Sequence, residues 1–213
     1  MTICIATKNL GKIQEFKFLF NEFIPSAGEI SLVGLNEFPG IKPTVEDGLT
    51  FLENARKKAL LAAEHTGLLC IADDSGLEVD ALNGAPGIFS ARYAGPNATD
   101  DENMRKLLSA LKDVPGDRRT ARFACVIAVA LPGDVLGLFE GYTHGLIADK
   151  ATGNNGFGYD PLFVKQDYGK TFAQLPHDVK NRISHRARAF EKATAIIERY
   201  IDTLRTARDR DTA

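Results

Sequence analysis

Cysteine is scarce in this sequence, and its placement excludes two kinds of site. The chain has 213 residues and only 3 cysteines, Cys4, Cys70 and Cys125, which lie far apart in apolar segments. A disulfide framework needs many closely spaced cysteines, and a cysteine metal cluster needs pairs separated by two residues. The sequence has neither pattern, so we expect three buried, reduced thiols.

Long apolar runs and an excess of charge of one sign are also missing. No apolar run reaches about 18 residues, and residues 1–6 lack the features of a secretory signal, so we expect a cytoplasmic protein with no membrane contact. Lys and Arg number 26 against 28 Asp and Glu, a net charge of -2. Without an overall basic field we expect no nucleic-acid partner. Any phosphate must then be bound by a local group of residues.

Short apolar runs predict a mixed sheet in this globular composition, which is 44% hydrophobic and 25% charged. They predict strands over residues 3–6, 68–72, 120–131 and 135–145. The last two are separated by Pro132-Gly133-Asp134, which indicates a hairpin and therefore an antiparallel pair. The strand over 68–72 is followed directly by Asp73 and Asp74, so two carboxylates are expected where a buried strand reaches the surface.

Apolar residues at helical spacing predict four helices that cover this sheet. They span residues 12–23, about 50–65, about 99–115 and 184–204. Thr50 and Thr99 each precede a glutamate by three residues, which is the spacing of a capping box, and Ser184 can cap the last helix. The predicted fold class is α/β, and the polar residues 207–213 are expected to form a disordered tail.

The segment from Thr7 to Lys12 lies between the first strand and the first helix. Free backbone N–H groups and the positive end of a helix dipole favour an anion there, and Lys8 and Lys12 add positive charge, so the segment indicates a phosphate site. The alternative is that Asn9 only caps the helix and the two lysines are solvated. The segment alone does not decide between these interpretations.

Three acidic residues form a candidate metal site. Asp73, Asp74 and the upstream Glu46 supply oxygen ligands with no nearby imidazole or thiolate, a set that suits Mg²⁺. A carboxylate beside such an ion can also deprotonate a water molecule. Adjacent acids at a strand end are also common as turn formers or helix caps, which is the alternative interpretation.

Two further segments carry groups suited to a purine base. The turn 155–161 has two glycines that allow close approach to a ligand, and Phe157 and Tyr159 could stack on a base or could belong to the core. Lys180, His185 and Arg186 surround the start of the last helix, where they can donate hydrogen bonds to a purine 6-oxo group or pair with phosphate. The alternative is a solvated basic face.

Taken together, these segments resemble the inosine triphosphate pyrophosphatase family, whose bacterial members are XTP/dITP diphosphatases. The matching stretches are ATKNLGK (6–12), VEDGLTFLENA (45–55), ADDSGLEVDALNGAPGIFSARYAG (72–95), GFGYDPLF (156–163) and KNRISHR (180–186). The long stretch at 72–95 is the most specific. The sequence departs from the usual family wording at Gln174 and Val179, and neither position carries a role below.

The resemblance implies a fold and a reaction. The fold is an elongated mixed β-sheet flanked by helices, with two lobes and a central nucleotide cleft, in a single domain over residues 1–206 of a homodimer. The reaction is Mg²⁺-dependent hydrolysis of the non-standard purine triphosphates XTP, ITP and dITP to the monophosphate and pyrophosphate, which cleanses the nucleotide pool. Two alternatives are a nucleotide-binding regulator that does not hydrolyse and a pyrophosphatase for modified pyrimidine triphosphates.

The resemblance also implies roles for individual residues. Asp74 is the catalytic proton acceptor and, with Glu46, a ligand of Mg²⁺, while Asp73 supports the metal site. The substrate-binding residues that it implies are Thr7, Lys8, Asn9, Leu10, Gly11, Lys12, Ser75, Phe157, Gly158, Tyr159, Asp160, Lys180, His185 and Arg186.

Overall fold

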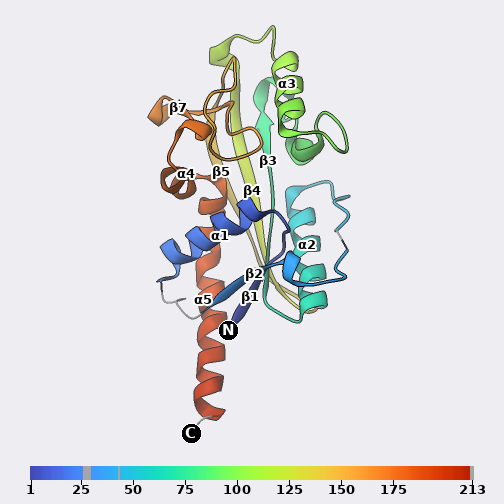
Figure 1. Ribbon diagram of the computed structural model, residues 1–213, viewed down its shortest axis with the longest axis vertical. Helices are drawn as coiled ribbons and strands as arrows, with labels where there is room; N and C mark the ends of the chain where they lie inside the picture. The colour runs from blue at the N-terminus through green and yellow to red at the C-terminus, as the bar shows by residue number, and fades with distance from the viewer. Residues whose placement is uncertain (26–29, 43, 212–213) are drawn as a thin grey trace.

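One seven-stranded sheet runs along the long axis of the molecule (Figure 1). The computed structural model describes residues 1–25, 30–42 and 44–211, with side chains described as far as residue 206. The strands are β1 (Thr2–Ile5), β2 (Ser31–Gly34), β3 (Cys70–Val79), β4 (Thr120–Leu131), β5 (Asp134–Ile147), β6 (Phe163–Lys165) and β7 (Lys170–Thr171).

The sheet is mixed, as the sequence predicts. Its order is β2-β1-β3-β4-β5-β6-β7, in which β1 is parallel to β2 and β3 and all later neighbours are antiparallel. The predicted hairpin is confirmed as the β4–β5 pair, which turns between Leu131 and Asp134. The short strands β2, β6 and β7 were not predicted, because two to four residues are too few to show a strand pattern.

Five α-helices accompany the sheet in residues 1–25, 30–42 and 44–211. They are α1 (Leu10–Phe23), α2 (Phe51–Thr66), α3 (Asp100–Ala110), α4 (His177–Ile183) and α5 (His185–Asp211). The predicted caps are confirmed, since the side chains of Thr50, Thr99 and Ser184 accept hydrogen bonds from the first turns of α2, α3 and α5. Helix α2 ends at Gly67, whose φ of 71° is a left-handed conformation that glycine adopts without strain.

Helix α5 is longer than the sequence predicts. The disordered tail expected from residue 207 is wrong as far as Asp211, because α5 continues to that residue. Extending an existing helix adds one hydrogen bond for each residue fixed, so polar residues can follow once the apolar face has ended. Residues 212–213 of the predicted tail lie outside the described residues.

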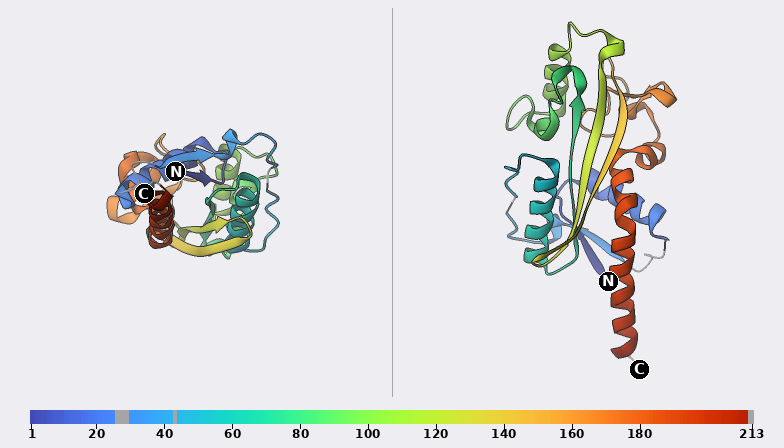
Figure 2. Two further views of the ribbon diagram at one scale, coloured as in Figure 1. Left: turned by 90° about the horizontal axis from the view of Figure 1, so that it is seen from below. Right: turned by 180° about the vertical axis from the view of Figure 1, so that it is seen from behind.

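Helices cover both faces of the sheet (Figure 2), and the two faces pack against different side chains. Small residues of α2 pack on one face, against Cys4, Cys70 and Ala72, while α1 and α5 pack on the other face, against Ile5 and Ile71. This division follows from the alternation of side chains along each strand. The C-terminal end of β3 and the N-terminal end of β4 form a third apolar cluster with α3 and the segment around β6.

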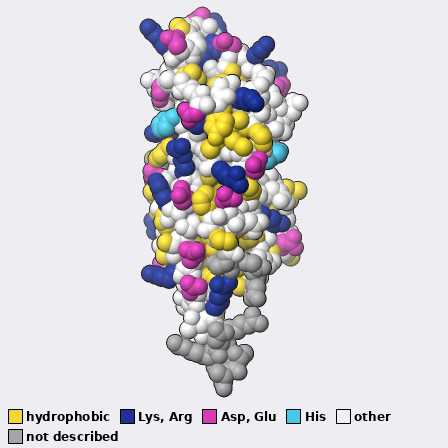
Figure 3. All heavy atoms as spheres, turned by 90° about the vertical axis from the view of Figure 1, so that its left-hand side faces the viewer, with side chains coloured by type: hydrophobic (Ala, Val, Ile, Leu, Met, Phe, Trp, Pro, Cys, Tyr) yellow, Lys and Arg dark blue, Asp and Glu magenta, His cyan; other side chains and the backbone are white. Residues whose placement is uncertain are grey.

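Several expectations from composition can be compared with the structure. Cys4, Cys70 and Cys125 are buried and free, as expected. Basic and acidic side chains are interspersed on the face shown in Figure 3. None of the helices in the described part of the chain is long and apolar enough to cross a membrane.

Candidate active site

Two neighbouring carboxylates on β3, Asp73 and Asp74, organise the site from opposite faces of the sheet. The prediction of a strand that ends at residue 72 is wrong, because β4 extends the antiparallel ladder through both residues to Val79. Only the parallel neighbour β1 ends early, where Ile5 pairs with Ile71. Side chains alternate along a strand, so Asp73 faces α1 and α5 whereas Asp74 faces α2.

Asp73 holds two cations in place. The Arg186 guanidinium donates to Asp73 Oδ2 from Nε and Nη2, at 3.1 and 2.6 Å, and Lys12 Nζ donates to Oδ1 at 2.9 Å. Burial by itself raises the pKa of Asp73, but the charges of Arg186, Lys12 and Lys58 outweigh it and hold that pKa well below its usual range. Asp73 is therefore ionised and fully engaged by basic side chains.

Asp74 belongs to a second group of charges, centred on Lys58 of α2. Lys58 Nζ lies 2.7 Å from Asp74 Oδ1 and 2.7 Å from Glu46 Oε1, and Asn54 Nδ2 donates to Asp74 Oδ2 at 3.3 Å. Burial raises the pKa of Asp74, although the charge of Lys58 opposes the shift. Lys58 was missed by the sequence analysis, although its four-residue spacing from Asn54 places both on one face of α2.

The predicted metal site consists of Glu46, Asp73 and Asp74. The Lys58 ammonium contacts both Glu46 and Asp74, so the two carboxylates converge on one point, and Mg²⁺ bound there would take the place of that ammonium. Mg²⁺ typically takes one or two carboxylates and completes its shell with water and phosphate, so this pair fits that ion. No group of three or more ligands is found among the described residues. The oxygens of Asp73 instead pair with Lys12 and Arg186.

The loop before α1 caps that helix and lines a cavity. Asn9 caps the helix, since its Oδ1 accepts a hydrogen bond from the backbone N–H of Lys12 at 3.2 Å. Lys12 is not solvated, because its ammonium pairs with Asp73. Thr7 and Lys8 line a cavity of about 320 Å³, which we call the cationic cavity. Leu10 is 68% exposed.

Residues of the cationic cavity come from five parts of the chain, of which β3 supplies Asp73. The residues are Ala6, Thr7, Lys8, Asn9, Lys12, Leu35, Lys42, Thr44, Glu46, Lys58 and Asp73. The loop after β1 supplies the first four, α1 and α2 supply one lysine each, and the segment between β2 and α2 supplies Glu46. The cavity thus lies at the carboxyl end of β1, the usual position of ligands in open α/β sheets.

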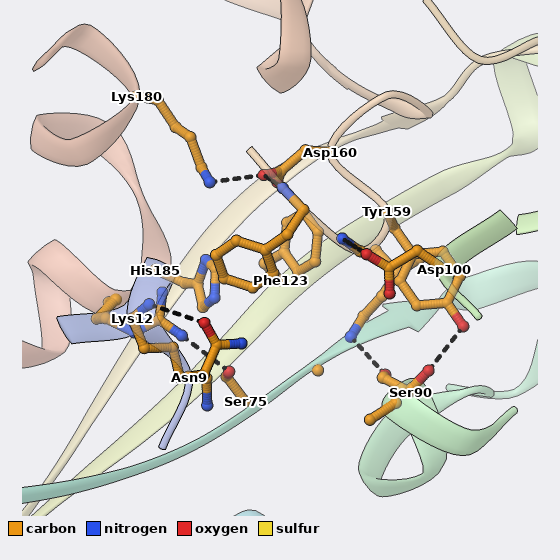
Figure 4. Close-up of a pocket in the computed structure, with 16 residues that line it drawn as sticks. Asn9, Lys12, Ser75, Ser90, Asp100, Phe123, Tyr159, Asp160, Lys180 and His185 are labelled. Atoms are coloured by element: carbon orange, nitrogen blue, oxygen red, sulfur yellow. Dashed lines mark hydrogen bonds and ion pairs between the residues drawn. The ribbon is translucent and has the colours of Figure 1, made fainter. Parts of the chain in front are cut away.

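A second cavity, of about 200 Å³, lies beside the first and is mostly apolar (Figure 4). We call it the ring cavity. Its lining is Asn9, Lys12, Ser75, Gly76, Leu77, Ser90, Ala91, Asp100, Phe123, Phe157, Gly158, Tyr159, Asp160, Lys180, His185 and Arg186. Tyr159 also belongs to the core, since it is 4% exposed and its hydroxyl donates to the Ser90 carbonyl at 3.0 Å. Phe157 instead lies under an ammonium, with Lys180 Nζ 4.9 Å from its ring centroid.

Lys180 is a buried cation with a remaining hydrogen-bond donor. Its ammonium contacts Asp160 Oδ2 at 2.6 Å and Glu15 Oε1 at 3.0 Å. An ammonium has three N–H donors, so two acidic partners leave one for a ligand. Glu15 also pairs with Arg186 and was not found from the sequence, where it is one charge among many on α1.

His185 supplies a neutral polar group to the ring cavity. Its imidazole stacks on Phe123 at 4.8 Å between centroids, and its Nδ1 is buried with no hydrogen-bond partner in the described part of the chain. Burial lowers the pKa of His185 well below its usual value, and the charges of Arg186 and Lys180 lower it further. A neutral ring with an unpaired nitrogen is suited to a hydrogen bond from a bound ligand.

The structure brings most of the predicted substrate residues to these two adjoining cavities, which share Asn9 and Lys12. Leu10 and Gly11 line neither cavity. A mostly apolar cavity with aromatic walls fits a flat ring, and the lysines beside it fit phosphate groups. The fold and site therefore define an α/β protein with a pocket of nucleotide type.

Comparisons with known proteins give the family. The family model described as Ham1 family matches residues 3–196, so the chain belongs to the Ham1 family. It is 51% identical to a dITP/XTP pyrophosphatase of Desulforamulus reducens, over 93% of this chain and 96% of the relative. It is 49% identical to a dITP/XTP pyrophosphatase of Geobacter sulfurreducens, over 88% of this chain and 92% of the relative.

Solved structures agree with this assignment. The Staphylococcus aureus Ham1 protein superposes with a TM-score of 0.80 at 43% identity, over 93% of this chain and 98% of that chain. A Mycobacterium abscessus structure described as a nucleoside-triphosphatase and dITP/XTP pyrophosphatase superposes with a TM-score of 0.71 at 40% identity, over 91% of this chain and 97% of that chain. The predicted family and fold class are confirmed.

Proposed function

We propose that this protein is a Mg²⁺-dependent pyrophosphatase that hydrolyses dITP, XTP and ITP to the monophosphate and pyrophosphate. The observation that carries the proposal is the junction of the ring cavity and the cationic cavity at Asn9 and Lys12. A nucleotide placed across this junction has its base among Phe157, Tyr159 and His185 and its phosphates among lysines. The names of the curated relatives support the same activity.

Recognition of the base depends on donors in the ring cavity. A 6-oxo purine has an acceptor oxygen where adenine has an amino group, and the free N–H of Lys180 favours an acceptor. Asp160 and Glu15 hold the Lys180 ammonium in position above the Phe157 ring. In this proposal Arg186 and His185 complete the polar contacts to the base.

Hydrolysis requires a water to attack the α-phosphorus while the bond to the α–β bridging oxygen breaks. The bridging oxygen leaves with pyrophosphate, and the water gives up one proton. Asp74 accepts that proton in our proposal, since its carboxylate is held by Asn54 and its pKa is raised by burial. Mg²⁺ held by Glu46 and Asp74 would offset phosphate charge. Lys12 and Lys58 stabilise the negative charge that builds up on the leaving group.

A release assay with a substrate panel tests this function. Pyrophosphate and orthophosphate are measured from XTP, ITP, dITP, GTP, ATP and a modified pyrimidine triphosphate, each with and without Mg²⁺. The expected result is pyrophosphate from the first three only, and only with Mg²⁺. Tight ITP binding without release would support the non-hydrolysing regulator instead. Release from the pyrimidine alone would support the third alternative.

Assembly and location complete the proposal. We propose a homodimer of single-domain subunits in the cytoplasm, where polymerases draw on the nucleotide pool. The assembly rests on the family resemblance, and the single domain is supported by one sheet that includes all seven strands. Size-exclusion chromatography with light scattering measures the assembly directly, and a monomer at micromolar concentration would contradict it.

A further inference from the structure

One lysine of the cationic cavity, Lys42, has no role in the site described so far. It lies on the irregular segment between β2 and α2, four residues before Glu46, and its side chain is exposed. Residues of the loop after β1 form another part of the same cavity. The two parts meet where Lys8 Nζ donates to the carbonyl oxygen of Ile41 at 3.5 Å, one residue before Lys42. Lys42 is therefore placed beside the loop that the proposed function assigns to phosphate.

The charges that line this cavity do not balance. Four lysines line it, but only two carboxylates do. Glu46 pairs with Lys58 and Asp73 pairs with Lys12, at 2.7 and 2.9 Å. Lys8 and Lys42 have no carboxylate partner among the residues that the structure describes. The cavity thus has positive charge available for an anion, on the two lysines that need not give up an existing ion pair.

The direction of a bound nucleotide follows from the shared residues. Asn9 and Lys12 line both cavities, so a nucleotide whose base is in the ring cavity enters the cationic cavity beside Lys12. Lys58 contacts Asp74 and the carbonyl oxygen of Asp73, the residue that Lys12 also contacts, so bond cleavage is placed near this entry. Lys42 lines the cationic cavity only. Lys12 and Lys58 pair with Asp73 and Asp74 near the entry, whereas Lys42 pairs with neither carboxylate among the described residues, so we place it beside the phosphate farthest from the base.

We propose that Lys42 binds the terminal phosphate of the substrate, and after cleavage the departing pyrophosphate, and so favours triphosphates over diphosphates. The inference rests on the proposed function and extends it to the length of the phosphate chain. A lysine acts on phosphate as a point charge, so the effect depends on charge more than on exact geometry. Lys42→Arg should therefore retain the preference that Lys42→Ala loses.

The test compares wild type with Lys42→Ala on dITP and dIDP. A lost hydrogen bond to a charged group costs about 1.5 kcal/mol or more, so kcat/KM for dITP should fall about tenfold while the value for dIDP stays the same. Inhibition by inorganic pyrophosphate should weaken by a similar factor, and inhibition by dIMP should not change. Lys112→Ala is the matched control, since the Lys112 side chain is 74% exposed and its ammonium pairs with Asp113 at 3.9 Å, away from both cavities.

The outcomes separate this inference from the proposed function. If Lys42→Ala lowers kcat/KM for dITP and dIDP and weakens inhibition by dIMP by the same factor, the site is damaged in general and the role of Lys42 is overturned. If none of these three values changes, the role of Lys42 is overturned too. Calorimetric titration with inorganic pyrophosphate gives a measurement that needs no turnover. If the wild type hydrolyses nothing but binds pyrophosphate more tightly than Lys42→Ala does, the proposed function fails and the anion role of Lys42 stands.

Discussion

Asp74 is the side chain on which turnover should depend most. Replacing it with asparagine keeps its shape but removes the proton acceptor and one negative charge. We expect the pyrophosphate release rate from dITP to fall by about 10²- to 10⁴-fold, the usual contribution of a general base. Circular dichroism should be unchanged. Asp47→Asn is the control, because Asp47 lies on the same segment as Glu46 but is 64% exposed and pairs with Lys57. Wild-type rates in Asp74→Asn would refute the assignment.

His185 should make the protein less stable in acid. Burial lowers its pKa in the folded state below the ordinary value of 6.5, so the unfolded chain takes up a proton that the folded protein does not. The free energy of unfolding should then fall by up to about 1.4 kcal/mol per pH unit below about pH 6.

The measurement is urea unfolding at pH 7 and pH 5. In His185→Gln, the loss of stability between these values should be smaller than in the wild type. His65 is exposed, so His65→Gln should lose as much stability between pH 7 and pH 5 as the wild type does. Equal pH dependence in all three proteins would show that His185 is not the group responsible.

The strands and helices that carry the site were predictable where they are long. The β4–β5 hairpin and the capped helices follow from patterns within single segments. The opposite directions of Asp73 and Asp74 do not, because they depend on β4 continuing the ladder beyond the end of β1. The prediction from sequence therefore placed Asp73 and Asp74 in one ligand set, whereas in the structure they lie on opposite faces of the sheet.

Ion pairs between distant elements were the least predictable feature. Lys58 joins α2 to β3, and Glu15 joins α1 to the start of α5 through Arg186. Each is an ordinary charged residue on a helix in the sequence, where most such residues are solvated. Only the packing of the helices on the sheet brings them to Asp74 and Arg186.

A contact between two elements should set the position of the turn that lines the ring cavity. Asp100, at the start of α3, accepts a hydrogen bond from the backbone N–H of Gly158 at 2.7 Å. Without it the turn 156–160 is less well positioned against a base. In Asp100→Ala we expect KM for dITP to rise several-fold, the cost of one lost charge-assisted hydrogen bond, with little change in kcat.

The control for this prediction is the adjacent residue. Asp101 has the same charge in the first turn of α3, but its side chain is 73% exposed and pairs with Arg105 of the same helix. Asp101→Ala therefore removes the same helix-dipole interaction without the contact to Gly158. Asp100→Asn retains an acceptor and should recover most of the wild-type KM. A rise in KM that is equal in Asp100→Ala and Asp101→Ala would contradict the positioning role.

The long sheet connects the stability of the protein to its active site through α5. Helix α5 packs along β4 and β5, and its first residues, His185 and Arg186, belong to the ring cavity. Gly141 of β5 lies where this packing is closest. A Cβ there would be under 3.0 Å from the carbonyl oxygen of His185 and the backbone nitrogen of Ala189. Neither group is the end of a flexible side chain, so the backbone of α5 would have to move.

Gly141→Ala should therefore reduce both stability and activity. Overpacking of this kind costs about 1–3 kcal/mol in the free energy of unfolding, measured in urea. The position of α5 sets the position of Arg186, which pairs with Asp73. Pyrophosphate release from dITP should therefore also fall when it is measured well below the melting temperature. Gly116→Ala is the matched control, since a Cβ at Gly116 meets nothing within 4 Å and the change should alter stability by less than about 0.5 kcal/mol. If Gly141→Ala has the same free energy of unfolding and the same rate of pyrophosphate release as the wild type, the contact between β5 and α5 does not hold the ring cavity in place.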